Sequence, residues 1–430
     1  MPPSPSLLGL PSDILGHVCA ALCPHCTRPA TAAASCDRRG IRALASLSRT
    51  CKALRDVAQP VLSHDLNPRS HIRLIRTLLA RPDLAACART LCNDGCLADL
   101  RDDDHPILEA AAARLGIALP EGWELEPDDN ADAVQSRVFD VLLALVPGLD
   151  TLGYTRYMNL TPTELLVGSD TALPSLRRLH VSYWDTEGGF DLGECRELLR
   201  LAPSLEYLGA RMCYAVRPGL ALANVRALHL QYSYLGVQDL QDAVRACPLL
   251  EEFSYKSGGS AVSQYTDGRA EFVPAEAMRE LETRKATLRR LDLDFDSGCG
   301  EYLHFFDSHV EADHAMGSLA GFPLLEMLLV PPEYFFGEDE WESSDMVEDL
   351  IEMLPPSLRF LGLHGKLDPF PSPEGLAEAI GRGVFPNLAK VVLKCSEGDT
   401  ERVKELFDAV GVEYEPYDSG SHDLPRGIYL

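Results

Sequence analysis

The residues best suited to metal or thiol chemistry gather near the start of the sequence. Cys23 and Cys26 form a C-x-x-C pair with His25 between them, and Cys36 follows ten residues later. A structural zinc site needs four ligands, usually supplied as two pairs, and only one pair is present. A metal site stays open as an alternative, but the pattern favours free thiols in a loop. The sequence therefore predicts no metal ion and no cofactor.

Other candidate catalytic groups lie at spacings that do not match known motifs. His309 and His314 are five residues apart, which misses the i, i+4 spacing that places two zinc ligands on one helix face. The segment around Lys366 lacks the glycine and hydroxyl residue of a phosphate-binding loop, and no nucleophile elbow or dinucleotide fingerprint occurs. We therefore expect no enzyme. The open alternative is catalysis from insertion loops, by His304, His309 and His314 with Asp313.

Composition and charge narrow the classes of function. The chain has 430 residues, of which 46% are hydrophobic and 24% charged, and its net charge is −26. Residues 1–70 hold eight basic and four acidic side chains, a net of +4, so the other 360 residues carry −30. The negative charge of these 360 residues would repel nucleic-acid phosphates, so we expect no nucleic-acid partner. The longest apolar run, Val141 to Pro147, is far shorter than the ~20 residues that span a bilayer, so we expect no membrane segment. The N-terminus lacks the basic and apolar regions of a secretion signal, and the chain has thirteen cysteines, an odd number. Both observations favour free thiols in a reducing compartment, the cytoplasm or nucleus.

One motif recurs nine times, at a mean spacing of about 30 residues, and determines the predicted fold. Each copy holds apolar residues at positions 0, +3 and +5, usually with a proline two residues before position 0. Positions +3 and +5 share one face of a short strand, and a helical run precedes most copies. Each helix is therefore expected to back a parallel strand. The residues at position 0 are Leu149, Leu176, Leu205, Val225, Leu250, Leu288, Leu325, Leu358 and Leu388.

This pattern resembles the leucine-rich repeat, and the resemblance covers about Leu84 to Leu393. It implies an α/β solenoid in which stacked units complete a common core. In that family an asparagine three residues after position +5 forms a buried ladder of hydrogen bonds. Here other residues take its place, among them Trp184, Cys213 and Ser233, so we expect an irregular solenoid. Two insertions, at residues 257–272 and 297–314, are expected to be loops at one edge.

Positions +2, +4 and +6 of each copy alternate with the core positions, so they should face an open inner surface. Six of these 27 positions are Lys or Arg and three are His, although the repeats as a whole are acidic. We hypothesise that this face holds an acidic or phosphorylated substrate segment, and the alternative is a solvated face of chance composition. The residues predicted to bind substrate are Arg178, His180, Arg211, His229, Gln231, Lys256 and Arg290.

Three short helices are predicted before the repeats. The first spans Leu10 to Leu22, where Ser12 can cap the helix and Asp13 suits its positive N-terminal end. The second and third fall within residues 41–50 and 51–62, each with apolar residues at helical spacing. Because so few ordered residues make a thin core, a partner that covers apolar surface is physically favoured.

These helices resemble the F-box, through Leu10-Pro11, Asp13, Ile14-Leu15, Leu44, Leu47-Ser48 and Cys51-Lys52 with Leu54. An F-box joined to leucine-rich repeats is an arrangement abundant in filamentous fungi. The resemblance implies that the helices dock on the small Skp adaptor, and through it on a cullin, while the repeats hold a protein substrate. Carried over by position, the adaptor-binding residues would be Leu10, Pro11, Ile14, Leu15, Leu44, Leu47 and Ser48.

The predicted fold is α/β: an irregular leucine-rich-repeat solenoid preceded by a small all-α F-box-like module. Residues 1–66 are assigned to the module (with an insertion at 23–40), 67–100 to a helical link and first repeat-like strand, and 101–430 to the repeats with a C-terminal cap. The expected function is substrate recognition in a Skp–Cullin–F-box ubiquitin ligase. The alternative is a leucine-rich-repeat interaction scaffold without a ligase role. The first helix has an apolar stripe formed by Ile14, Leu15, Val18, Cys19 and Leu22. The scaffold alternative predicts that this stripe is buried within the chain, whereas the ligase subunit leaves part of it exposed.

Overall fold

The structure is a computed structural model of the chain. It describes residues 9–27, 38–67, 70–93, 104–121, 123, 131–156, 163–167, 169, 171–183, 188–258, 270–295, 312–336, 345–364, 370–396 and 398–417. The chain divides into two compact units. Unit 1 contains residues 1–184, 194–205 and 423–430, and unit 2 contains residues 185–193 and 206–422.

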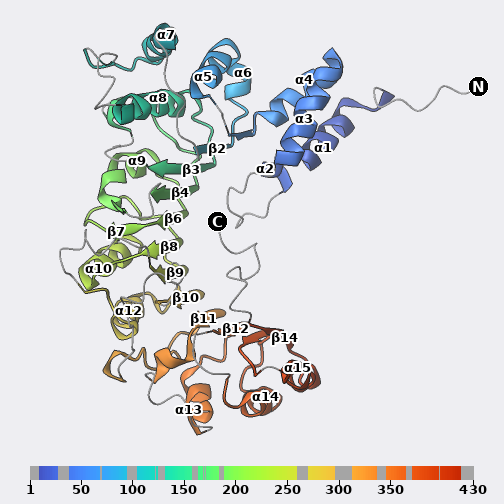
Figure 1. Ribbon diagram of the computed structural model, residues 1–430, viewed down its shortest axis with the longest axis vertical. Coiled ribbons are helices and arrows are strands. Elements are labelled where there is room, and N and C mark those ends of the chain that lie inside the picture. The colour runs from blue at the N-terminus through green and yellow to red at the C-terminus, as the bar shows by residue number, and fades with distance from the viewer. Residues whose placement is uncertain are drawn as a thin grey trace, which may run out of the picture. The chain divides into compact units, whose positions relative to one another are not determined.

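Unit 1 begins with helices and continues with strands and helices in alternation (Figure 1). The predicted helical module, residues 1–66, falls inside this unit. The α-helices and strands of unit 1 are α1 (Ser12–Leu22), α2 (Pro24–Thr27), α3 (Arg38–Thr50), α4 (Lys52–Leu62), β1 (Asp65–Leu66), α5 (His71–Ala80), α6 (Pro82–Ala85), β2 (Thr90–Asn93), α7 (His105–Leu115), α8 (Ala131–Leu145), β3 (Thr151–Arg156), β4 (Arg178–Tyr183) and α9 (Arg196–Leu201).

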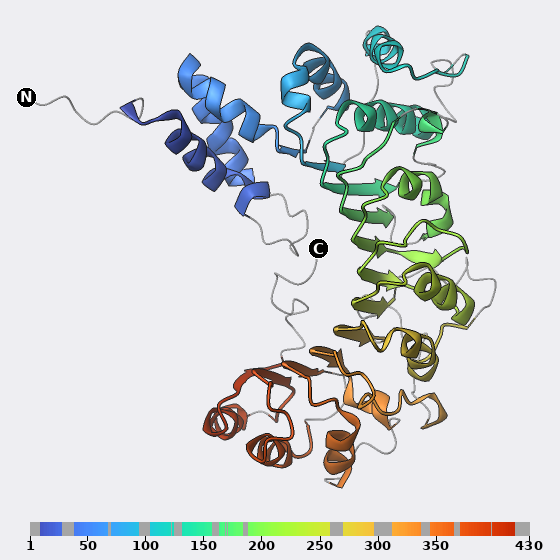
Figure 2. The ribbon, with the colours of Figure 1, turned by 180° about the vertical axis from the view of Figure 1, so that it is seen from behind.

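Unit 2 repeats a strand followed by a helix or an irregular segment. In both views α10 and α12 lie on the same side of strands β8 to β10 (Figures 1 and 2). Its elements include β5 (Phe190–Asp191), β6 (Tyr207–Arg211), β7 (Cys213–Ala215), β8 (Ala227–Ser233), α10 (Val237–Ala246), β9 (Glu252–Ser257), α12 (Pro274–Leu281), β10 (Arg290–Asp294), β11 (Met327–Val330), α13 (Asp345–Met353), β12 (Phe360–Leu363), α14 (Pro373–Gly381), β13 (Lys390–Leu393), α15 (Thr400–Ala409) and β14 (Glu413–Pro416).

The strands form one parallel sheet of twelve strands, in the order β1-β2-β3-β4-β6-β8-β9-β10-β11-β12-β13-β14. Neighbours in the sheet are also neighbours in sequence, apart from β5 and β7, which pair with each other in a second small sheet. Helices alternate with these strands, so the predicted α/β class is confirmed. Among the described residues, no helix is both long enough and apolar enough to cross a membrane.

Each of the nine predicted copies forms a strand that begins two residues after its position 0. In the fifth copy, for example, Leu250 precedes β9, and Phe253 and Tyr255 at positions +3 and +5 are fully buried. All nine residues at position 0 are buried as well. The predicted helices before the copies also form, among them α10 and α14. The core therefore follows the apolar triple along the whole array.

The strands are joined at their start by a regular pattern of backbone hydrogen bonds. The carbonyl at position +1 accepts the N–H groups of positions +1 and +2 in the next strand. Arg226 O, for example, accepts from Glu251 N at 2.7 Å and from Glu252 N at 2.8 Å. In unit 1 the same pattern begins at His64, whose carbonyl accepts from Arg89 N at 3.1 Å and Thr90 N at 2.8 Å. His64 thus occupies position +1 of a strand that lies before the nine predicted copies.

Candidate functional site

The first helices of unit 1 pack into a helical module, which in the described part of the chain contains residues 9–27 and 38–66. Leu44 of α3, Ala58 of α4 and Cys19 of α1 are almost completely buried against one another. Partly buried apolar side chains surround this centre: Leu22, Leu47, Val57, Val61 and Leu62. The apolar spacing in each helix therefore produces a small common core, as its sequence predicts.

An apolar row on this module stays exposed. Leu10 just before α1, and Ile14 and Val18 within it, are 41%, 42% and 40% exposed. They are four residues apart, so they follow one another along a single face of the helix. Leu15 and Cys19, each one residue further along α1 and so about 100° around the helix, are buried in the module. We call Leu10, Ile14 and Val18 the α1 row.

The structure divides the seven predicted adaptor-binding residues into two groups. Leu10, Pro11 and Ile14 are exposed, and Leu47 is half-buried. The other three, Leu15, Leu44 and Ser48, are buried inside the module. The Ser48 hydroxyl donates a hydrogen bond to the carbonyl of Ala45 at 2.9 Å, within its own helix. These three residues build the core beneath the exposed face, since the packing of α3 on α1 and α4 turns them inward.

The insertion at residues 23–40 leaves its two ends close together. It starts with α2 (Pro24–Thr27) rather than with a loop, and α3 begins at Arg38. Residues 28–37, which include Cys36, lie outside the described residues. A Cβ atom at Gly40 would lie 2.1 Å from the carbonyl oxygen of Leu22, so only glycine fits where α3 passes the end of α1. The extra residues therefore leave α1 and α3 in direct contact.

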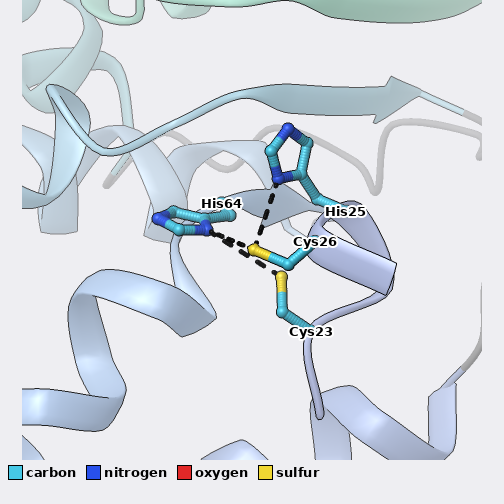
Figure 3. A group of neighbouring side chains, drawn as sticks. All are labelled: Cys23, His25, Cys26 and His64. Atoms are coloured by element: carbon cyan, nitrogen blue, oxygen red, sulfur yellow. Dashed lines mark hydrogen bonds between the residues drawn. The ribbon is translucent and has the colours of Figure 1, made fainter. Parts of the chain in front are cut away.

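Two cysteines and two histidines converge at the end of the module (Figure 3). Cys23 follows α1, His25 and Cys26 lie in α2, and His64 lies between α4 and β1. Cys26 Sγ lies 3.4 Å from His64 Nδ1 and 3.7 Å from His25 Nδ1, and Cys23 Sγ lies 3.9 Å from His64 Nδ1. His64 could not be identified from spacing in the sequence because it lies 38 residues from Cys26.

The Cys26 thiol and the His64 imidazole, the two central groups of the cluster, are both uncharged at neutral pH when no metal is bound. Burial raises the pKa of the Cys26 thiol to about 11, and the neighbouring Cys23 adds to the rise. Burial lowers the pKa of His64, and His25 and Arg89 act in the same direction. At neutral pH Cys26 is therefore a thiol next to a neutral imidazole, which makes it a poor nucleophile. This arrangement does not favour cysteine-based catalysis.

In unit 1, two of the predicted substrate-binding residues lie on β4. Arg178 forms an ion pair with Asp150, and its Nε donates to Thr151 Oγ1 at 3.0 Å. This guanidinium group is therefore engaged by the neighbouring strand. His180 lies two residues further along β4 and is half-buried.

In unit 2, the other five predicted residues differ in exposure. His229 and Gln231 are buried, which corrects the expectation that they face an open surface. The other three residues are more accessible to solvent: Arg211 is exposed, and Lys256 and Arg290 are half-buried. The Arg211 guanidinium lies over the Tyr232 ring, 4.8 Å from its centre.

His229 is buried because neighbouring strands surround it. Its Nδ1 lies 3.3 Å from the Tyr207 hydroxyl, and its Nε2 lies 3.6 Å from Glu252 Oε2. The His229 ring is the main cause that lowers the pKa of Glu252, Arg290 adds to the lowering, and burial opposes it. His229 thus contacts two cross-strand neighbours, and alternation along one strand did not reveal them.

The groups considered for catalysis do not assemble into a site within the described residues. His304 and His309 lie outside the described residues, while His314 Nε2 lies 3.8 Å from the carboxylate of Asp313 next to it in sequence. An open pocket of about 410 Å³ in unit 1 is lined in part by Asp140. Burial raises the pKa of Asp140 to about 7, but its two oxygens accept backbone N–H groups at 2.7 and 2.9 Å. That carboxyl group stabilises the turn at residues 163–165.

No protein-family model and no curated protein matches this chain. Three features remain as candidate sites: the α1 row, the cysteine–histidine cluster, and the basic residues on the strands of unit 2.

Proposed function

We propose that this chain is a substrate-recognition subunit of a Skp–Cullin–F-box ubiquitin ligase. In this proposal the helical module binds the Skp adaptor, and through it a cullin, and the strands of an irregular leucine-rich-repeat array bind a protein substrate. The chain catalyses no step itself. It raises the effective concentration of the substrate near the conjugating enzyme, in the cytoplasm or nucleus.

The α1 row is the observation that carries the proposal. Seven large hydrophobic side chains are exposed in the described part of the chain, and three of them form this row. A scaffold whose first helix only caps the array would bury this face. The row gives a partner a compact apolar anchor, and the exposed polar residues Asp13 and His17 lie on the same helix.

Basic residues on unit 2 support the proposed substrate site. Arg211 lies at the end of β6, Lys256 lies near the end of β9, and Arg290 is the first residue of β10. Cationic side chains bind carboxylates and phosphates through charge-assisted hydrogen bonds. We therefore propose an acidic or phosphorylated protein segment as substrate. The buried His229 has a structural role in this proposal because it contacts Tyr207 and Glu252.

A calorimetric titration of the purified full chain with a recombinant Skp adaptor tests the proposal. The double variant Ile14→Asp, Val18→Asp should weaken binding by about 30-fold or more, since truncation of a central apolar anchor costs about 2 kcal/mol or more. Leu249→Asp is the matched control, because Leu249 is similarly exposed at 39% but lies in unit 2. Circular dichroism checks that each variant stays folded. A wild-type chain that does not bind, or equal binding by both variants, would refute the proposal.

A further inference from the structure

We propose a structural zinc site whose four ligands are Cys23, His25, Cys26 and His64. The site does not depend on the proposed function, because it follows from the cysteine–histidine cluster alone. Two segments supply the ligands: residues 23–26, from the end of α1 into α2, and the turn between α4 and β1 that carries His64. A C-x-x-C pair completed by ligands from a segment distant in sequence is typical of structural metal sites in small domains.

The distances between the donor atoms fit tetrahedral zinc. Bonds of about 2.3 Å to sulfur and about 2.0–2.1 Å to nitrogen separate a sulfur ligand from a nitrogen ligand by about 3.6 Å. Three of the four sulfur–nitrogen pairs in the cluster lie at 3.4, 3.7 and 3.9 Å. All four donor atoms lie within 4.8 Å of one another, while two sulfur ligands of one zinc ion are about 3.8 Å apart. The two nitrogen ligands of one zinc ion are about 3.3 Å apart, so binding needs shifts of about 1.5 Å or less.

The way the donor atoms converge favours a central cation over ordinary hydrogen bonds. His64 Nδ1 is approached by both sulfur atoms, and Cys26 Sγ is approached by both imidazoles. One imidazole nitrogen has a single proton or a single lone pair, so it cannot form good hydrogen bonds with two thiols at once. A metal ion in the middle satisfies every donor atom.

The chemistry of the donors selects zinc. Two thiolates and two neutral imidazoles form a Cys2His2 set, and the two thiolate charges balance the charge of Zn²⁺. Four protein ligands close the coordination shell, which is the arrangement of structural and not of catalytic zinc. Cys23 is buried, whereas Cys26 is exposed and His25 is half-buried, so the ion can enter from the solvent side.

The site would connect the helical module to the sheet. The carbonyl of His64 accepts N–H groups from Arg89 and Thr90 and so begins the backbone pattern that joins the strands. A zinc ion on its imidazole would tie this first strand to the end of α1. The helix that carries the α1 row would then be held on the edge of the sheet.

Metal analysis of the tag-free full chain, purified under reducing conditions, tests the inference. Inductively coupled plasma and native mass spectrometry should find one zinc ion per chain. X-ray absorption at the zinc edge should find two sulfur and two nitrogen neighbours. Cys26→Ser and His64→Gln should each lose the zinc, whereas Cys51→Ser and His17→Gln, in the same module but outside the cluster, should keep it. Removal of zinc by a chelator should lower the melting temperature, and zinc but not magnesium should restore it.

Three results would overturn the inference. The first is a folded chain that contains no zinc and takes none up from a zinc-buffered solution. The second is zinc whose amount stays the same in Cys26→Ser and His64→Gln. The third is a Cys23–Cys26 disulfide that forms in place of metal binding under the same reducing conditions. Circular dichroism identifies any variant that unfolds. If a variant unfolds, X-ray absorption on the folded wild-type chain still tests whether two sulfur and two nitrogen atoms bind the zinc.

Discussion

Replacing Glu271 with glutamine should remove a pH-dependent loss of stability in unit 2. The Glu271 carboxyl group contacts the Tyr255 hydroxyl, and Ser257 Oγ lies 2.9 Å from its second oxygen. Tyr255 also donates to the carbonyl of Ser233 at 3.0 Å and accepts from Leu235 N at 3.2 Å. The Tyr255 and Ser257 hydroxyls both donate to the carboxyl oxygens of Glu271, and Tyr255 shares its single proton between Glu271 and the carbonyl of Ser233. Burial has the largest effect and raises the pKa of Glu271 to about 7, although the hydrogen bonds from Tyr255 and Ser257 act in the opposite direction.

The size of the effect follows from that shift. The ordinary pKa of 4.5 applies to the unfolded chain, so between pH 4.5 and 7 the folded state binds the proton and the unfolded state releases it. The stabilising contribution is complete below pH 4.5 and is lost as the pH rises to 7. From about pH 5.5 to about pH 8 the free energy of unfolding should fall by about 2 kcal/mol. Since Glu271 keeps partial exposure as a residue, screening by solvent reduces this to about 1–2 kcal/mol.

Urea unfolding followed by circular dichroism at several pH values measures this difference. Glutamine resembles the protonated acid, so the stability of Glu271→Gln relative to wild type should increase by about 1–2 kcal/mol between about pH 5.5 and pH 8. Taking the difference cancels the titration of all other groups. A difference that stays constant over this range, or that changes in the opposite direction, would refute the raised pKa of Glu271.

Three further changes test other parts of the structure. Gly40→Ala should destabilise the helical module by about 1–3 kcal/mol in thermal unfolding, because its Cβ would lie 2.1 Å from the carbonyl oxygen of Leu22; an unchanged melting temperature would contradict this contact. Asp140→Asn should cost about 1–3 kcal/mol and speed hydrogen exchange in the turn at residues 163–165, and unchanged exchange there would argue against its role. Arg211→Glu should change stability by less than about 0.5 kcal/mol but weaken binding of acidic peptides, and equal binding would remove Arg211 from the proposed substrate site.

The repeat pattern could be predicted from sequence because its physical cause is local. An apolar triple such as Leu250, Phe253 and Tyr255 determines which face of a strand enters the core, whatever the neighbouring strand contains. The α/β class and the position of each of the nine strands follow from that periodicity. The three short N-terminal helices could be predicted for the same reason.

The candidate sites depend on contacts between residues that are distant in the sequence, and the pattern within one segment does not predict such contacts. His229 belongs to the face that alternation predicts to be open, yet Tyr207 and Glu252 on adjacent strands contact its ring. The spacing of Cys23, His25 and Cys26 is visible in the sequence, but the fourth member of the cluster, His64, reaches Cys26 only through the packing of α1 on α4. Side-chain periodicity thus predicts orientation, while exposure and ligand sets depend on tertiary packing.

The central claim is that the α1 row binds the Skp adaptor and thereby places the chain in a cullin complex. Size-exclusion chromatography with light scattering of the full chain, the Skp adaptor and a cullin measures this assembly directly. The wild-type chain should elute in a complex with the mass of all three proteins, and Ile14→Asp, Val18→Asp should elute alone while remaining folded. A folded wild-type chain that elutes alone in the presence of both partners would contradict the claim.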